Sequence, residues 1–220
     1  MERTVANKSK EVLVLFSGGR DSSSVAVLLA KMGYKVKLFT CVAGPSELTG
    51  PFGDSAPDIR HKELIKVFSQ NIDKQRILEN DSYLIRKLAI EKTNIEHVVY
   101  PLALALSAHS TAICYCLKNN IKIIASGYSG YQAKEDKYIE QRKDFITLTK
   151  KFLGDYNISY LTPVIEKSEL EIKDVLERCG ISSNSLEEKA LFGGISFDKE
   201  KALEFWQSSI PICQDFIKSI

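Results

Sequence analysis

The sequence lacks any long apolar run, and its first residues lack the apolar stretch of a signal peptide. Residues 1–10 are polar and charged, and no apolar run approaches the length of a membrane helix, which is roughly 18 residues or more. These absences predict a cytoplasmic protein without a membrane partner.

Paired cysteines are absent as well. The five cysteines are odd in number and none forms a C-x-x-C pair, so we expect neither a disulfide framework nor a zinc site of the usual spacing. Cys114 and Cys116 would lie roughly 200° apart around a helix, which indicates core cysteines rather than a reactive pair. Cys41, at the end of an expected strand, is the thiol most worth testing for chemistry.

Charge of one sign is not in excess. The 30 basic and 28 acidic residues give a net charge of +2, which argues against a nucleic-acid partner and leaves room for a local basic patch. The hydrophobic share of 44% is sufficient for a globular core. The length of 220 residues allows one large domain, or one domain with a small appendage.

Strands and helices alternate along the chain. An apolar run at 12–16, helical spacing at 22–32 and a second expected strand at 36–41 predict a βαβ unit and therefore a parallel sheet. Further strands are expected at 95–100, 121–125 and 158–161. Further helices are expected at 59–68, 83–92, 102–117 and 170–179, together with one that follows the polar stretch 132–142 and ends at 153, and one or two within 198–220. This pattern predicts a doubly wound α/β fold with a mostly parallel five-stranded sheet. Residues 1–180 would form the α/β domain and 181–220 a helical appendage, whose apolar residues would pack onto the domain or onto a second subunit in a homodimer.

Ligands of such folds bind beyond the carboxyl ends of the strands. There the chain has Ser17-Gly18-Gly19-Arg20-Asp21-Ser22, between the first strand and the first helix. Two glycines let backbone N–H groups approach an anion, and the helix directs its positive dipole end to the same place. Ser17, Ser22 and Ser23 would add hydroxyl donors, and Asp21 fits a helix cap or a magnesium ligand. The alternative is a tight turn with an ordinary cap. The string is neither the Walker pattern nor the dinucleotide G-x-G-x-x-G.

The string resembles the S-G-G-x-D-S signature of the PP-loop, or N-type ATP pyrophosphatase, superfamily. The resemblance implies an adenine nucleotide alpha hydrolase-like fold and ATP bound by its pyrophosphate on this loop. It implies cleavage between the α and β phosphates, adenylation of a substrate oxygen, and Mg²⁺ held by Asp21. Adenine would lie near Phe39 and Thr40, and Gly127, in the turn after the fourth strand, would also contact the nucleotide.

Within that superfamily, the chain is most similar to 7-cyano-7-deazaguanine synthases. The similar segments are Asp58-Ile59-Arg60-His61-Lys62-Glu63, Ser126-Gly127-Tyr128, Glu140-Gln141-Arg142-Lys143-Asp144-Phe145, Thr162-Pro163 and Lys167-Ser168-Glu169-Leu170-Glu171. The zinc-binding cysteines of that branch have no counterpart in 182–194, and Pro101-Leu102 stands where that branch has Arg-Asn. We therefore expect no zinc and a changed substrate.

The leading hypothesis is an ATP-dependent, AMP-forming ligase or amidotransferase that acts on a small-molecule acid or carbonyl, with a deazapurine-like compound as one candidate. Lys167 and Arg142 would stabilise the leaving pyrophosphate, although both residue types also occur on solvated surfaces. His61 would be an acid–base group or a partly buried helix residue. Because no glutaminase domain is seen, ammonia would come free or from a partner. The alternatives are a tRNA-modifying enzyme of the thiolation type and a non-catalytic nucleotide-binding subunit.

Overall fold

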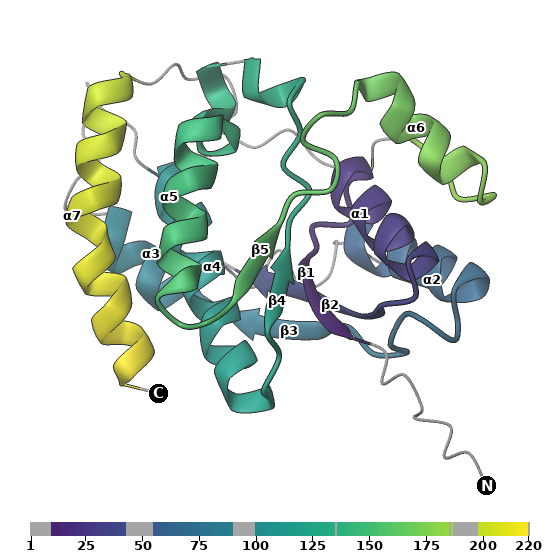
Figure 1. The fold of residues 1–220 in the computed structure, drawn as a ribbon, viewed down its shortest axis with the longest axis horizontal. Helices are drawn as coiled ribbons and strands as arrows, with labels where there is room; N and C mark the ends of the chain where they lie inside the picture. Colours follow the sequence, from purple (N-terminus) through teal and green to yellow (C-terminus); the bar gives the residue numbers. More distant parts are fainter. Residues whose placement is uncertain are drawn as a thin grey trace, which may run out of the picture.

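The chain folds around a five-stranded parallel sheet (Figure 1). A computed structural model describes residues 10–42, 55–89, 100–134, 136–184, 186 and 198–219. The sheet has the order β3-β2-β1-β4-β5. Its strands are β1 (Glu11–Leu15), β2 (Lys35–Val42), β3 (Ile77–Asn80), β4 (Ile123–Ala125) and β5 (Ser159–Leu161). The expected α/β class and the five parallel strands are confirmed.

One strand differs from the expectation. The third strand of the sheet is Ile77–Asn80, paired with β2 from Phe39↔Ile77 onward, whereas the sequence suggested 95–100. Residues 95–99 lie outside the described part of the chain, and Tyr100 begins a helix. β3 is a four-residue edge strand with every second residue exposed, so it lacks the apolar run that marks a buried parallel strand.

Helices cover both faces of the sheet (Figure 1). One face carries α1 (Arg20–Lys31), α2 (Ala56–Val67) and α6 (Glu169–Glu177). The other carries α3 (Ser82–Ala89), α4 (Tyr100–Asn119), α5 (Lys143–Gly154) and α7 (Lys199–Lys218). Two short 3₁₀ helices, Gln132–Lys134 and Asp136–Gln141, connect β4 to α5. None of the helices in the described ranges is long and apolar enough to cross a membrane.

The core lies in two layers separated by the sheet. Along β1, Val12 and Val14 pack under α1 and α6, while Leu13 packs under α4 on the opposite face. All three side chains are fully buried. Burial on both faces explains why the strand reads as a continuous apolar run.

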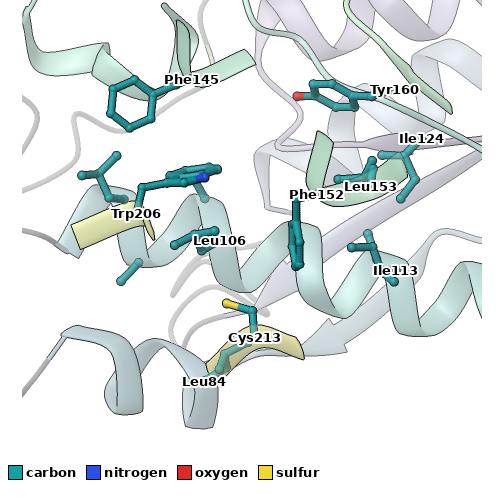
Figure 2. Close-up of a cluster of buried hydrophobic side chains, with 14 of the residues drawn as sticks. Leu84, Leu106, Ile113, Ile124, Phe145, Phe152, Leu153, Tyr160, Trp206 and Cys213 are labelled. Atoms are coloured by element: carbon teal, nitrogen blue, oxygen red, sulfur yellow. The ribbon is translucent and has the colours of Figure 1, made fainter. Parts of the chain in front are cut away.

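The C-terminal helix α7 belongs to the core layer of α4 and α5. The ring of Trp206 is almost fully buried and meets Phe145 edge-on, with centroids 5.4 Å apart and an interplanar angle of 82° (Figure 2). Cys213 lies about two turns further along α7 and is buried beside Leu84 of α3 (Figure 2). The apolar side of the tail therefore packs onto the α/β domain itself. A homodimer and a domain boundary near residue 180 stay predictions.

Candidate functional site

The loop between β1 and α1 is shaped by its two glycines. Gly18 has φ +79°, and a Cβ atom there would lie 2.4 Å from the backbone nitrogen of Pro57. Gly19 is the N-cap of α1 and supplies no side-chain cap to the helix. The first helical hydrogen bond runs from Ser23 N to Gly19 O at 3.1 Å, so the N–H groups of residues 20–22 precede the intrahelical pattern. An uncapped helix start at the carboxyl end of a strand is suited to binding an anion.

The serines of the loop divide into two roles. Ser23 is fully buried, and its hydroxyl donates to Gly19 O at 2.7 Å, which holds the first turn together. Ser22 is also buried and donates to the same carbonyl at 3.2 Å. Ser17 is exposed, and its Oγ accepts from Gly19 N at 3.2 Å. Of the predicted hydroxyl donors, Ser17 is the one whose side chain reaches solvent.

The turn after β4 packs directly against this loop. It contains a tandem repeat, Ser126-Gly127-Tyr128-Ser129-Gly130-Tyr131, and each glycine is a point of close backbone approach. A Cβ atom at Gly127 would lie 2.5 Å from Ser22 N, and one at Gly130 would lie 2.3 Å from Ile165 O. The predicted residue Gly127 is thus placed against the first turn of α1, at the point where the strand order reverses around β1.

Asp21 is held by Tyr131, a residue that was not among the predicted site residues. The Tyr131 hydroxyl lies 3.1 Å and 3.0 Å from the two carboxylate oxygens of Asp21. Burial, together with the negative charge of Asp21, raises the pKa of Tyr131 to about 12, so the hydroxyl stays protonated as a donor. The second Ser-Gly-Tyr of the tandem repeat is the sequence signal that could have identified Tyr131.

The neighbouring Arg20 ties the same loop to α6. Its guanidinium lies 2.9 Å from Glu169, and Glu169 in turn lies 3.0 Å from Lys173. Ser24, one turn further along α1, donates to Ile172 O at 3.1 Å. These contacts fix the start of α1 relative to α6. The start of α6 in turn borders a cavity.

A cavity of about 770 Å³ brings together two residues predicted from distant parts of the sequence, Arg142 and Lys167. It is lined from the loop after β4, from the start of α5 and from the start of α6. Its wall comprises Gly130, Tyr131, Ala133, Lys134, Gln141, Arg142, Lys143, Asp144, Ile165, Glu166, Lys167, Ser168 and Glu171. Lys134, like Tyr131, was not among the predicted residues.

The two predicted adenine contacts on β2, Phe39 and Thr40, differ in their exposure to solvent. Phe39 is 1% exposed and packs on Tyr115 of α4, with ring centroids 5.6 Å apart. Thr40 is partly exposed, and its hydroxyl donates to Phe16 O at 2.6 Å. Thr40 is therefore the member of this pair whose side chain lies nearer the surface.

A buried polar chain runs beneath the turn after β4. Nδ1 of His109 donates to Ala105 O at 2.6 Å, which leaves Nε2 as the acceptor 3.2 Å from the Tyr160 hydroxyl. That hydroxyl lies 2.6 Å from Ser126 Oγ. Burial lowers the pKa of His109 to about 4, so the ring is neutral. These hydrogen bonds link the core residue His109 to Ser126 at the end of β4, and the side chains involved are all buried.

Glu140, in the segment between β4 and α5, is an acid with a raised pKa. Burial raises its pKa to about 7, and its Oε2 atom has no hydrogen-bond partner among the described residues. Its charge also acts on the hydroxyls of Tyr128 and Tyr160, whose pKa values are raised first by burial. The next residue, Gln141, accepts from Ser129 N at 2.9 Å and lines the cavity.

The residues of the Arg-His segment serve the structure of α2 in this arrangement. Arg60 is fully buried and binds Glu63 and the carbonyl groups of Ser182 and Asn184. Nε2 of His61 lies 2.9 Å from Asp73 O. The Arg60 contacts anchor the chain that follows α6 to α2, and the His61 contact joins α2 to the segment before β3.

The cysteines give no sign of shared chemistry. Burial raises the pKa of Cys114 and Cys213 to about 11 and that of Cys116 to about 12, so these thiols are poor nucleophiles. Cys41 and Cys179 are partly exposed. In the described ranges, no three His, Cys, Asp or Glu residues group together as a metal site.

Residues 10–179 match a protein family of unknown function, DUF7411. The chain belongs to this family. No protein of curated function matches the DUF7411 chain significantly in sequence.

Several solved structures are similar to the DUF7411 chain. A 4-thiouridine synthetase, in complex with RNA and with bound ATP, aligns with TM-score 0.57 and 13% identity over 94% of this chain and 53% of that one. The U34-tRNA thiolase NcsA from Methanococcus maripaludis, with its [4Fe-4S] cluster, aligns with TM-score 0.53 and 13% identity over 99% and 69%. A predicted subunit of tRNA methyltransferase from Methanocaldococcus jannaschii aligns with TM-score 0.45 and 22% identity over 79% and 90%. At these identities the first two establish the adenine nucleotide alpha hydrolase-like fold, as expected from the sequence.

Proposed function

We propose that the chain is an ATP-dependent enzyme of the PP-loop type, which adenylates an oxygen of an RNA substrate and releases pyrophosphate. The observation that carries the proposal is the uncapped first turn of α1, which follows Gly18-Gly19 at the carboxyl end of β1. N–H groups that precede the intrahelical bonds, a positive helix end and a close backbone approach would together form a site for a polyphosphate.

Each loop residue has a definite role in this proposal. ATP, when bound, would supply the adenylyl group and the pyrophosphate leaving group. The backbone N–H groups of residues 20–22 and the Ser17 hydroxyl would bind phosphate oxygens, while Ser22 and Ser23 keep the turn closed through Gly19 O. Asp21 would hold Mg²⁺, since Mg²⁺ takes one or two protein carboxylates and completes its shell with phosphate and water oxygens. Thr40 and the neighbouring backbone would border the adenine.

RNA is favoured as the substrate because the two fold neighbours with the higher TM-scores are described as a synthetase bound to RNA and a tRNA thiolase. The cysteines do not favour sulfur transfer by the protein's own thiols, since three of the five are buried with raised pKa values. The modification we propose is therefore an adenylation of an RNA oxygen, which releases pyrophosphate, followed by attack of a nucleophile that displaces AMP and that these thiols do not supply.

A second candidate is the ligase or amidotransferase acting on a small-molecule acid or carbonyl, with a deazapurine-like substrate as one case and ammonia from a partner. The size of the cavity favours it, because about 770 Å³ lies within the range of small-molecule sites.

The test uses the full chain with Mg²⁺ and ATP labelled at the α-phosphate, with and without a total tRNA fraction. AMP and pyrophosphate should form, and tRNA should raise the rate. Asp21→Asn should lower it by about 10², whereas Asp155→Asn, which changes an exposed aspartate after α5, should leave it unchanged.

Different products separate the alternatives. ADP and phosphate would contradict the proposal. AMP formation that ignores tRNA and responds to a small acid or carbonyl would favour the second candidate. Tight ATP binding without turnover under any condition would indicate a nucleotide-binding subunit.

A further inference from the structure

The cavity lies beside the loop between β1 and α1, which is the proposed phosphate loop. It is lined by basic side chains that form few ion pairs among the described residues. It receives the amino ends of two helices, α5 and α6, whose first residues form much of its wall. The N-cap of α5, Arg142, supplies no side-chain cap. Helix starts attract anions. At the start of α5 the N–H of Phe145 binds Asp144, whereas the N–H groups of Lys143 and Asp144 precede the intrahelical bonds. We infer that this cavity is a subsite for a backbone phosphate of the RNA substrate, separate from the loop that would bind the phosphates of ATP.

The carboxylates around the cavity are already committed to other partners. Glu171 accepts from Ser168 N and Ser168 Oγ, at 2.8 Å and 2.7 Å, as the capping box of α6. Asp144 binds Lys199 at 2.9 Å and the backbone N–H of Phe145 at 3.1 Å.

The remaining acid, Glu166, lies 3.6 Å from Lys143, and both side chains are more than three-quarters exposed. Such a pair contributes little.

Three cations are left to face the cavity. In the part of the chain that the structure describes, Lys134 and Lys167 form no ion pair, and the guanidinium of Arg142 reaches a carboxylate only through Nε, 3.7 Å from Asp144. The planar end of Arg142 thus keeps donors for a phosphate, which guanidinium groups bind in a bidentate manner. Arginine, lysine and helix starts are the usual contacts of protein to nucleic-acid phosphate.

The subsite is distinct from the ATP loop but touches it at one side chain. None of residues 17–23 lines the cavity, all of them lying in the described part of the chain. Tyr131 lines it and also binds Asp21. An RNA phosphate held by Arg142 and Lys167 would therefore place an adjacent nucleotide next to the loop where adenylation would occur. This inference rests on the proposed function, because it assumes an RNA substrate.

The test measures binding rather than turnover, so its failure can be distinguished from failure of the proposed function. The double variant Arg142→Gln/Lys167→Gln is compared with Lys150→Gln/Lys151→Gln, which removes the same charge from exposed positions on α5. The probes are a fluorescently labelled tRNA transcript, titrated at several salt concentrations, and ATP with Mg²⁺. Thermal unfolding checks that both variants fold.

We expect the first double variant to bind tRNA at least tenfold more weakly at low salt. The slope of log K against log salt should shrink by about 0.7–0.9, since the two side chains share one phosphate and the variant loses that contact. Its affinity for ATP should stay within twofold, and the control pair should match the wild type. Unchanged tRNA binding, absence of tRNA binding by the wild type, or a parallel loss of ATP affinity would each overturn the inference. The last result would assign both cations to the phosphates of ATP.

Discussion

The hydroxyl of Tyr131 lies 3.1 Å and 3.0 Å from the two carboxylate oxygens of Asp21. These residues come from opposite sides of the point where the strand order reverses, one from the helix after β1 and one from the turn after β4. The contact holds the carboxylate in one orientation at the start of α1. It also joins the phosphate loop to the cavity, because Tyr131 lines that cavity.

Replacing Tyr131 with Phe removes this contact without changing the ring. A hydrogen bond to a charged group is worth about 1.5–3 kcal/mol, so the free energy of unfolding should fall by about that amount. Affinity for magnesium-ATP should fall about fivefold or more as Asp21 loses its orientation. Urea denaturation and calorimetric titration measure the two effects. Tyr83→Phe, at a side chain that is 67% exposed, is the matched control; equal behaviour of the two variants would contradict the assigned role.

Gly127→Ala tests the close approach of the turn after β4 to α1. The new methyl group would meet Ser22 N at 2.5 Å and Ser22 Cα at 2.8 Å, both of them backbone atoms. Overpacking of this kind costs about 1–3 kcal/mol, and displacement of the first turn should also weaken ATP binding. The control is Gly154→Ala at the end of α5, where a Cβ meets nothing within 4 Å. That variant should be neutral or stabilising by up to about 1 kcal/mol.

Glu140→Gln tests the buried acid through the pH dependence of stability. The folded protein holds the proton of Glu140 up to about pH 7, against an ordinary value of 4.5. The unfolded chain therefore releases this proton first, and the contribution of Glu140 to stability declines between about pH 4.5 and 7 and then stays low. The whole decline is at most about 3 kcal/mol. Gln cannot ionise, so the variant should lose this decline and be more stable than the wild type at pH 8.

Thermal unfolding at half-unit pH steps measures the effect. His109 contributes in the opposite direction between about pH 4 and 6.5, because its lowered pKa makes the unfolded chain bind the extra proton. The informative quantity is consequently the difference between the wild type and the variant. An unchanged pH profile would contradict the burial of the Glu140 carboxyl, whose Oε2 atom has no hydrogen-bond partner among the described residues.

Trp206→Ala tests whether α7 belongs to the same folding unit as the sheet. The ring packs edge-on against Phe145 and is almost fully buried, and truncation of a buried aromatic side chain costs about 3–5 kcal/mol. One cooperative transition with a much lower midpoint is expected by chemical denaturation. Gln207→Ala, at the exposed neighbouring position, should change little. A separate early transition would instead indicate that the helix unfolds independently.

The sequence predicted the two central strands, since β1 carries a continuous apolar run and β2 is rich in β-branched and other apolar residues. It missed β3, because Ile77–Asn80 is short and half exposed at the sheet edge. Its pairing depends on the neighbouring β2 rather than on its own pattern. The helix α7 was expected, but its close packing on α4 and α5 required tertiary structure.

The turn between β1 and α1 and the helix that it opens were predictable because their signals are local: glycines, hydroxyl groups and a helix start within six residues. Contacts between distant segments were not. Nothing near Arg20 in the sequence suggests Glu169, and nothing near Asp21 suggests Tyr131. Arg142 and Lys167 were selected separately, and the fold places both on one cavity wall. Phe39 was expected to lie near the adenine, and its side chain is 1% exposed within the core layer of α4.

The glycines around the loop have a consequence for the kinetics of ligand binding. Backbone atoms of Pro57, Ser22 and Ile165 stand where side chains at Gly18, Gly127 and Gly130 would otherwise lie. The loop is consequently braced by rigid backbone before any nucleotide arrives, so binding pays little ordering entropy at these positions. A preorganised loop of this kind should associate with nucleotide in a single fast phase, with no slow conformational step, and affinity differences among variants should appear mainly in the dissociation rate.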